Sequence, residues 1–227
     1  MLDSLASLWQ TVRSELKPVE IYAAITSLFC VYLTVKNNIW NWFWGLIGSV
    51  LYGYIFFRIS HLYANAGLQL LYFVPMQFLG WYVWFKGNPD KNDALPISAL
   101  TNRERVVWSA ITLLLSVALF YGLSPLVTAF RLPLPQLPPM DCFTTGLSIV
   151  AQFLQTYKKF ENWIFWIVAD LIYTFYIFPK LKMPVTTLLY AVFTILAITG
   201  AVGWYRQMRR EPPSALVTDT GNGDIPA

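Results

Sequence analysis

Residues 41–49 read Asn-Trp-Phe-Trp-Gly-Leu-Ile-Gly-Ser, and residues 162–170 read Asn-Trp-Ile-Phe-Trp-Ile-Val-Ala-Asp. The two stretches align without a gap at a constant offset of 121 residues, and the same offset places Tyr52 on Tyr173. Similarity at a fixed spacing is the signature of an internal duplication. We therefore expect the chain to contain two related halves.

The composition indicates a membrane protein. Of the 227 residues, 56% are hydrophobic and 12% are charged, whereas soluble domains have about 45–50% and about 25%. The 16 Lys and Arg and the 12 Asp and Glu lie in short clusters between long apolar runs. Basic clusters beside apolar runs suit the lipid bilayer better than nucleic acid. We expect an all-α polytopic membrane protein that does not bind nucleic acid.

Seven apolar runs are long enough to cross a bilayer as helices. The expected spans are residues 19–35, 39–57, 63–85, 106–130, 141–157, 161–178 and 185–205. Three helices reverse the direction of the chain, so two parallel copies need one connecting helix between them. The sequence therefore predicts seven transmembrane helices in a 3+1+3 arrangement of parallel repeats. Such repeats are typical of transporters with a substrate site near the midplane, and rocking of the halves gives alternating access.

The expected organisation has five parts. They are an interfacial N-terminal segment (1–18), a first three-helix repeat with its cytoplasmic loop (19–105), a connecting helix and loop (106–140), a second three-helix repeat (141–210) and a disordered C-terminal tail (211–227). Ten Lys and Arg fall on one side of the spans and six on the other. Because basic residues favour the cytoplasmic side, we expect the N-terminus outside and the C-terminus in the cytoplasm.

Asp170 is the ionisable residue deepest in the apolar spans. Its burial costs several kcal/mol, so it should face the interior of the bundle. Trp163 and Trp166 lie seven and four residues before it, which places all three on one helix face. Two indoles beside a carboxylate suit a flat, positively charged ring through stacking, cation–π attraction and charge pairing. The alternative is that the tryptophans only pack and that Asp170 bonds a neighbouring helix.

Polar and aromatic side chains in other spans extend the predicted substrate site. These candidates are Ser49, Gln69, Tyr72, Gln77, Trp81 and Gln152. Amides and hydroxyls would bind a ribose or an amide group, and Pro75 would free backbone groups and bend the third span. The alternative is interhelical hydrogen bonding, which contributes on average only about 0.6 kcal/mol. Ser49 would alternatively allow close helix approach.

The sequence resembles the PnuC family of bacterial vitamin transporters over roughly residues 20–205. The resemblance rests on residues 44–48, 62–64, 68–69, 73–81 and 147–151, and above all on Glu161-Asn162-Trp163 with Trp166. It implies a SWEET-like fold, a homotrimer with one pathway per protomer, and a multi-pass location in the bacterial inner membrane. It also implies facilitated diffusion of a vitamin that a cytoplasmic kinase then traps. The type member of this family takes up nicotinamide riboside.

The chain departs from the family at Asp170. Family members that carry nicotinamide riboside typically have Asn at the end of the Trp-x-x-Trp-x-x-x-Asn stretch. A carboxylate suits the pyridinium charge of nicotinamide riboside and equally the thiazolium charge of thiamine, and the family also contains riboflavin carriers. We expect a small cationic vitamin as substrate, with nicotinamide riboside first and thiamine or riboflavin as alternatives.

Two other classes of function compete with transport. An intramembrane enzyme would need a nucleophile with a base or a metal cluster, and the sequence has no such motif. The single His61 has no partners for a zinc site, and we expect no metal and no cofactor. A non-transporting membrane scaffold would explain the aromatic packing, but it gives no reason for a buried carboxylate between indoles.

Overall fold

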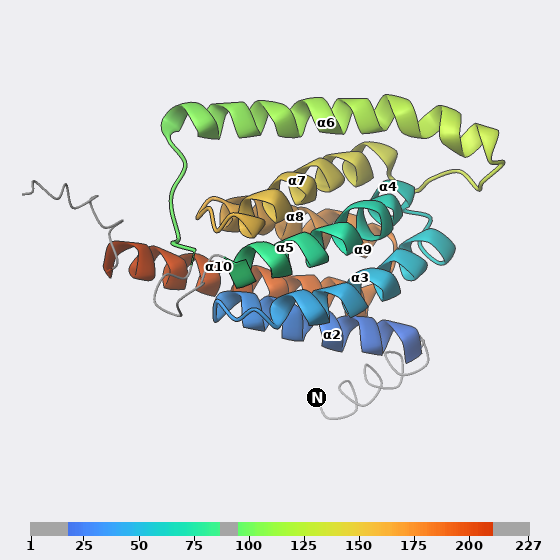
Figure 1. The fold of residues 1–227 in the computed structure, drawn as a ribbon. Coiled ribbons are helices and arrows are strands. Elements are labelled where there is room, and N and C mark those ends of the chain that lie inside the picture. Colours follow the sequence, from blue (N-terminus) through green and yellow to red (C-terminus); the bar gives the residue numbers. More distant parts are fainter. Residues whose placement is uncertain (1–17, 87–94, 211–227) are drawn as a thin grey trace, which may run out of the picture.

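The computed structural model describes residues 18–86 and 95–210 and is helical through most of this part (Figure 1). The expected tail lies outside the described residues, and so does the expected interfacial segment apart from its last residue. Within the described residues the chain forms no strands, and a single isolated bridge joins two loops at Ser98 and Lys159. The fold class is therefore all-α, as predicted.

The helices follow the apolar runs. They are α2 (Pro18–Val35), α3 (Asn41–Arg58), α4 (Tyr63–Gly67), η1 (Leu68–Phe73), α5 (Val74–Lys86), α6 (Asn102–Ala129), α7 (Pro138–Thr156), α8 (Asn162–Ile172), η2 (Tyr173–Ile177), α9 (Phe178–Lys180) and α10 (Pro184–Arg210). The helices α4, η1 and α5 run on without a break, and so do α8, η2 and α9. Each trio is one long helix with a π-helical turn inside it.

Three helices in the described part are long and apolar enough on their own to cross a membrane. They are Asn102–Ala129, Asn162–Lys180 and Thr186–Arg210, and Val19–Val35 is a shorter apolar helix. Hydrophobic side chains such as Leu71, Phe85 and Leu114 are exposed on the outside of the bundle. An apolar outer surface of this kind is suited to contact with lipid.

Both π-helical turns end two residues before a proline, Pro75 in the first case and Pro179 in the second. The residue before each proline donates its amide to a carbonyl five residues back, that of Gln69 or of Tyr173. A proline has no amide hydrogen, and its ring displaces the carbonyl four residues earlier. At both places the helix is therefore wider, and its hydrogen bonds reach five residues back instead of four.

Matching indole pairs recur in the two expected halves. Trp42 packs edge-on against Trp84 with ring centroids 5.2 Å apart at 86°, and Trp163 packs against Trp204 at 5.3 Å and 87°. Trp42 and Trp163 are equivalent in the aligned stretches at the offset of 121 residues. Edge-to-face geometry is a preferred arrangement of aromatic rings. The two aligned stretches therefore make the same edge-to-face indole contact.

Left-handed backbone positions recur at the same offset. Asn37 and Lys158 have φ of 54° and 48°, and His61 and Lys182 have φ of 50° and 53°. Positive φ is uncommon for residues other than glycine. Each of the two turns therefore has the same unusual backbone conformation in both halves.

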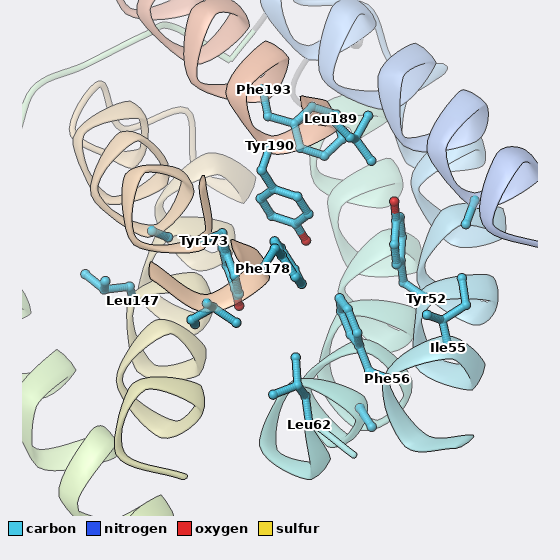
Figure 2. Close-up of a cluster of buried hydrophobic side chains, with 14 residues drawn as sticks. Tyr52, Ile55, Phe56, Leu62, Leu147, Tyr173, Phe178, Leu189, Tyr190 and Phe193 are labelled. Atoms are coloured by element: carbon cyan, nitrogen blue, oxygen red, sulfur yellow. The ribbon is translucent and has the colours of Figure 1, made fainter. Parts of the chain in front are cut away.

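The largest hydrophobic cluster centres on Phe178 (Figure 2). The Phe178 ring lies 5.2 Å from Tyr173, 6.4 Å from Phe56 and 4.8 Å from Tyr190, measured between centroids. These rings come from α3, η2, α9 and α10, so the cluster joins the two expected halves. The buried Leu62 extends it to the loop between α3 and α4.

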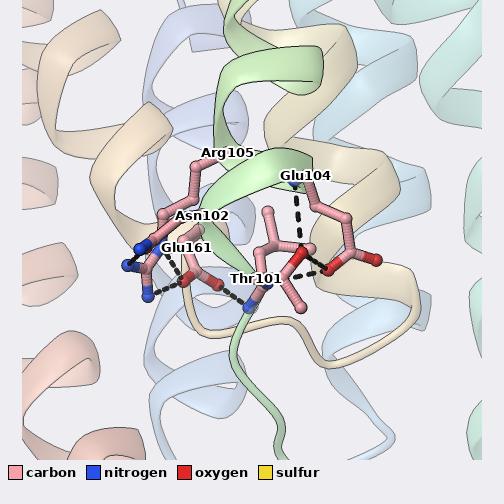
Figure 3. Close-up of polar contacts among 6 residues, drawn as sticks. Thr101, Asn102, Glu104, Arg105 and Glu161 are labelled. Atoms are coloured by element: carbon pink, nitrogen blue, oxygen red, sulfur yellow. Dashed lines mark hydrogen bonds and ion pairs between the residues drawn. The ribbon is translucent and has the colours of Figure 1, made fainter.

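Helix α6 lies on the outside of the bundle along α7 (Figure 1). It begins with a capping box, in which the Glu104 amide donates to the Thr101 hydroxyl and the Thr101 amide donates to the Glu104 carboxylate. Beside it, the buried Glu161 accepts from the Leu100 amide at 2.9 Å and pairs with Arg105 at 2.8 Å (Figure 3). Glu161 thereby ties the start of α6 to the loop before α8.

The indole of Trp163 lies directly on Gly200 in α10, where a Cβ would overlap the ring. We expect Gly200→Ala to lower stability by about 1–3 kcal/mol, because the indole cannot move out of a filled core. Gly203→Ala, in the same helix with open space around it, should instead gain about 0.5–1 kcal/mol of helix stability. The midpoint of heat-induced loss of monodisperse protein in detergent measures both. Equal effects of the two substitutions would contradict this packing.

Candidate functional site

A cavity of about 130 Å³ lies between the two expected halves. Its polar lining comprises Ser27, Thr34, Ser49, Gln69, Gln77, Gln152, Gln155 and Asp170. Its aromatic lining comprises Tyr52, Phe73, Trp163, Trp166, Tyr190 and Phe193. Asp170 is the single charged residue among the described lining residues. Aromatic walls with a few polar groups are typical of small-molecule sites.

The Asp170 carboxylate lies in the cavity and has no partner among the described residues. Its side chain is 6% exposed, and no group between residues 18–86 or 95–210 donates a hydrogen bond to it or forms a salt bridge with it. A buried charge is costly unless it is paired and hydrogen-bonded. The cavity is therefore suited to a ligand that brings a positive charge or a donor to Asp170.

The two predicted indoles line the same cavity from α8. The Trp166 Nε1 donates to the Gln155 Oε1 at 2.9 Å, and the Trp166 ring meets the edge of Phe73 at 6.0 Å. Trp163 is only 1% exposed, and its buried Nε1 has no acceptor in the described part of the chain. The hydrogen bond and the ring contact fix the Trp166 plane, as a stacking surface requires.

Four glutamine side chains line the cavity, two from α7 and two from the α4–η1–α5 helix. Gly45 makes room for Gln77, because a Cβ there would lie 2.6 Å from the Gln77 Oε1. The buried Gln152 Nε2 finds no acceptor among the described residues. Gln69 and Gln77 are eight residues apart and share the cavity across the π-helical turn. Free amide groups at a cavity wall can bind hydroxyls or amides of a ligand.

The structure places two predicted site residues elsewhere. The Tyr72 hydroxyl donates to the Ile149 carbonyl at 3.0 Å and does not line the cavity. Trp81 packs edge-on against Trp40 at 5.3 Å and lines a separate groove between α3 and α5. The wide turn of η1 keeps residues four apart on one face. Gln69, Phe73 and Gln77 therefore face the cavity, and Tyr72 does not.

The sequence prediction missed several lining residues. They are Ser27, Thr34, Tyr52, Tyr190 and Gln155. Gln155 lies three residues after Gln152, so one helix face carries both amides. The polar spacing in the fifth span could have revealed Gln155. The two tyrosines carry no such signal, because a tyrosine in an apolar span serves equally well in packing.

A buried lysine lies near the Trp163 end of the bundle. Lys158 is 3% exposed, and its Nζ lies 4.5 Å from the centre of the Trp84 ring. The Trp84 Nε1 donates to the Thr156 carbonyl at 3.2 Å. Burial disfavours the charged form and lowers the pKa of Lys158 to about 8. This contact joins the end of α5 to the loop between α7 and α8.

The fold is that of a helical membrane protein, and its internal cavity is suited in lining to a small ligand. The family model described as nicotinamide mononucleotide transporter matches residues 17–206, so the chain belongs to this transporter family. In the described residues, no group of three or more metal-binding side chains lies together.

Three relatives show how far the similarity extends. The nicotinamide riboside transporter PnuC of Escherichia coli K12 is 30% identical over 89% of this chain and 91% of its own length. The PnuC protein of Haemophilus influenzae is 24% identical over 91% and 87%. A solved structure, described as a crystal structure of the vitamin B3 transporter PnuC, has a TM-score of 0.67 at 27% identity and covers 85% of this chain and 82% of that one.

Lys158→Met should remove a pH dependence of stability. The unfolded chain holds the Lys158 proton up to about pH 10.5 and the folded chain up to about pH 8. Stability should therefore rise by about 3 kcal/mol as the pH increases through this window. We expect the variant to lack that rise and to be more stable at pH 7. Thermal midpoints from pH 7 to pH 10.5 measure it, with exposed Lys86→Met as control. A parallel profile for wild type and Lys158→Met would contradict the assignment.

Proposed function

We propose that this chain takes up nicotinamide riboside across the bacterial inner membrane by facilitated diffusion with alternating access. The observation that carries the proposal is the Asp170 carboxylate, which lies beside two indoles in the cavity and has no partner within residues 18–86 and 95–210. The names of the similar proteins, nicotinamide riboside transporter PnuC, support the same substrate.

In the proposed site, the Trp166 indole forms the stacking surface for the pyridinium ring, and the buried Trp163 indole forms the cavity wall next to it. Asp170 pairs with the positive charge of that ring. The ribose and the amide are bound by side chains that line the cavity on both sides, namely Ser49, Gln69, Gln77 and Gln152. Tyr72 and Trp81 hold the surrounding helices, since their contacts lie outside the cavity. The site thus binds the charged end and the polar end of one flat cation.

The proposed architecture has seven transmembrane helices in a 3+1+3 arrangement, with α6 as the connecting helix. The matching indole pairs and the matching left-handed turns support a duplication. The proposed orientation has the N-terminus outside and the C-terminus in the cytoplasm, which rests on the distribution of Lys and Arg. The five-part organisation follows from this arrangement. The cavity then lies where the two halves meet, as alternating access requires.

The proposed assembly is a homotrimer with one pathway per protomer. Helix α6 carries exposed apolar side chains, including Leu114, Phe120 and Tyr121, which suit either lipid or a neighbouring protomer. Because facilitated diffusion only equalises concentrations, net uptake requires a cytoplasmic kinase that phosphorylates and traps the vitamin. A membrane scaffold would not need a polar cavity with a carboxylate that no described residue pairs.

Thiamine is the second candidate substrate. Its thiazolium cation could pair with Asp170 in the same way, and the carboxylate is the observation that favours it. Riboflavin is a weaker candidate, because its ring is uncharged and leaves Asp170 unpaired.

Binding to purified protein tests the substrate. We expect nicotinamide riboside to bind more tightly than thiamine, riboflavin or nicotinamide mononucleotide. This chain has a carboxylate where riboside carriers of the family typically have Asn, so in this chain the charge pair takes part in binding, and Asp170→Asn should weaken binding by about thirtyfold, equivalent to ~2 kcal/mol for a lost buried charge pair. The uncharged dihydro form of the riboside should lose much less on the same substitution. The exposed Glu104→Gln serves as control. Preferential binding of thiamine would replace the first candidate, and equal losses for both riboside forms would contradict charge pairing.

Transport into liposomes tests the mode of uptake. We expect the internal concentration of nicotinamide riboside to approach the external one and to stop there, with or without a pH or sodium gradient. The reason is that Asp170 pairs with the substrate itself, so no ion is needed. Liposomes that enclose a riboside kinase should accumulate phosphorylated product. Accumulation above the outside concentration without the kinase would show ion coupling instead.

A further inference from the structure

A second buried carboxylate lies outside the cavity. Asp141, in the first turn of α7, has no exposed surface. It accepts hydrogen bonds from the backbone amides of Ala64 and Asn65, at 3.1 Å each, and from the side-chain amide of Asn65. No cation forms a salt bridge with it within residues 18–86 and 95–210. In the part of the chain that the structure describes, only backbone and side-chain amides therefore donate to this carboxylate.

Asp141 caps a helix that belongs to the other expected half. The helix that begins at Tyr63 has no side-chain cap of its own, since Leu62 precedes it. The first amides of a helix have no partner within it, and the positive end of the helix dipole favours a carboxylate there. Asp141 supplies that carboxylate from 76 residues away in the chain. The start of the α4–η1–α5 helix is thus fixed by α7.

Asn65 is also held from a third helix. The Tyr173 hydroxyl donates to the Asn65 Oδ1. Tyr173 is the first residue of η2, and its ring packs against both Phe178 and Tyr190, at 5.2 Å and 4.7 Å. The donor and acceptor groups of the Asn65 side chain are therefore both engaged, one by α7 and one by η2.

We propose that Asp141, Asn65 and Tyr173 form a clamp that positions the polar side chains of the cavity. The proposal rests on the function proposed above. Gln69 lies one turn after Asn65, and Asp170 lies one turn before Tyr173. The clamp therefore fixes the first expected half close to Gln69 and the second close to Asp170, the residues that face the ligand.

The π-helical turns explain why such positioning is needed. One of them begins three residues after Asn65 and the other begins at Tyr173 itself. A widened turn has less favourable hydrogen bonding than an α-helix and is often found at functional sites. A small rotation at either turn would swing Gln69 or Asp170 away from the ligand. The clamp opposes both rotations with one set of hydrogen bonds.

Two variants test the clamp by different routes. Asp141→Asn removes the charge and one acceptor, and Tyr173→Phe removes the hydroxyl while keeping the ring. Tyr176→Phe is the matched control, because Tyr176 lies in the same π-helical turn with its ring under Lys180 and outside the cavity. Calorimetry on monodisperse protein gives the Kd for nicotinamide riboside. We expect both clamp variants to raise it about tenfold and the control to leave it unchanged.

A coupling measurement separates positioning from general stability. If the clamp acts through Gln69, Asp141→Asn should add less than about threefold to the Kd of Gln69→Ala. A purely structural role would give independent, additive losses, and that result would overturn the proposal. An unchanged Kd in Tyr173→Phe would also overturn it. A tenfold effect that disappears in the Gln69→Ala background would support it.

Hydrogen exchange gives a readout without ligand. Backbone amides of residues 64–70 should exchange faster in Tyr173→Phe than in Tyr176→Phe, because Asn65 loses one of its two anchors. If wild-type protein failed to bind nicotinamide riboside, the proposed substrate would be wrong. The difference in hydrogen exchange would then still test whether the clamp exists. Equal exchange in the two variants would overturn it.

Discussion

A carboxylate inside an apolar bundle needs donors or a counter-charge, and this protein meets that need differently at two positions. Asp141 is fully buried and satisfied by the amides at the start of a helix. Asp170 faces the cavity and is left without a protein partner in the described part of the chain. The first arrangement fixes the two expected halves to each other. The second leaves a buried negative charge that a cationic ligand can compensate.

The aromatic framework makes each half stiff enough to present such a site. Trp42 and Trp163 pack against equivalent partners, and each lies on a glycine that lets a neighbouring helix approach closely. Between the halves, the cluster around Phe178 fills the region beside the loop that contains Leu62. Close-packed aromatic contacts transmit small shifts as rigid-body movements of whole helices. This framework is compatible with movement of one half against the other.

The two prolines determine which side chains of their helices face the cavity. Pro75 and Pro179 each follow a π-helical turn, and the turns lie beside Gln69 and Asp170. A regular α-helix rotates by about 40° over four residues beyond a full turn, whereas a π-helical turn reduces this drift. Gln69, Phe73 and Gln77 therefore stay on the cavity side together. The same widening moves Tyr72 to the Ile149 carbonyl.

The sequence alone determined the features that depend on neighbours along one helix. Helix bounds lie within five residues of those expected, and Trp163, Trp166 and Asp170 share a face because a helix has a fixed period. Tertiary structure decided the features that depend on residues far apart in the chain. It turned Tyr72 and Trp81 away, brought in Tyr52, Tyr190 and Gln155, and paired Asp141 with Asn65. The rotation of each helix decides which side chains face the cavity, and contacts between distant segments decide which residues pair. No local sequence pattern determines the rotation or the contacts.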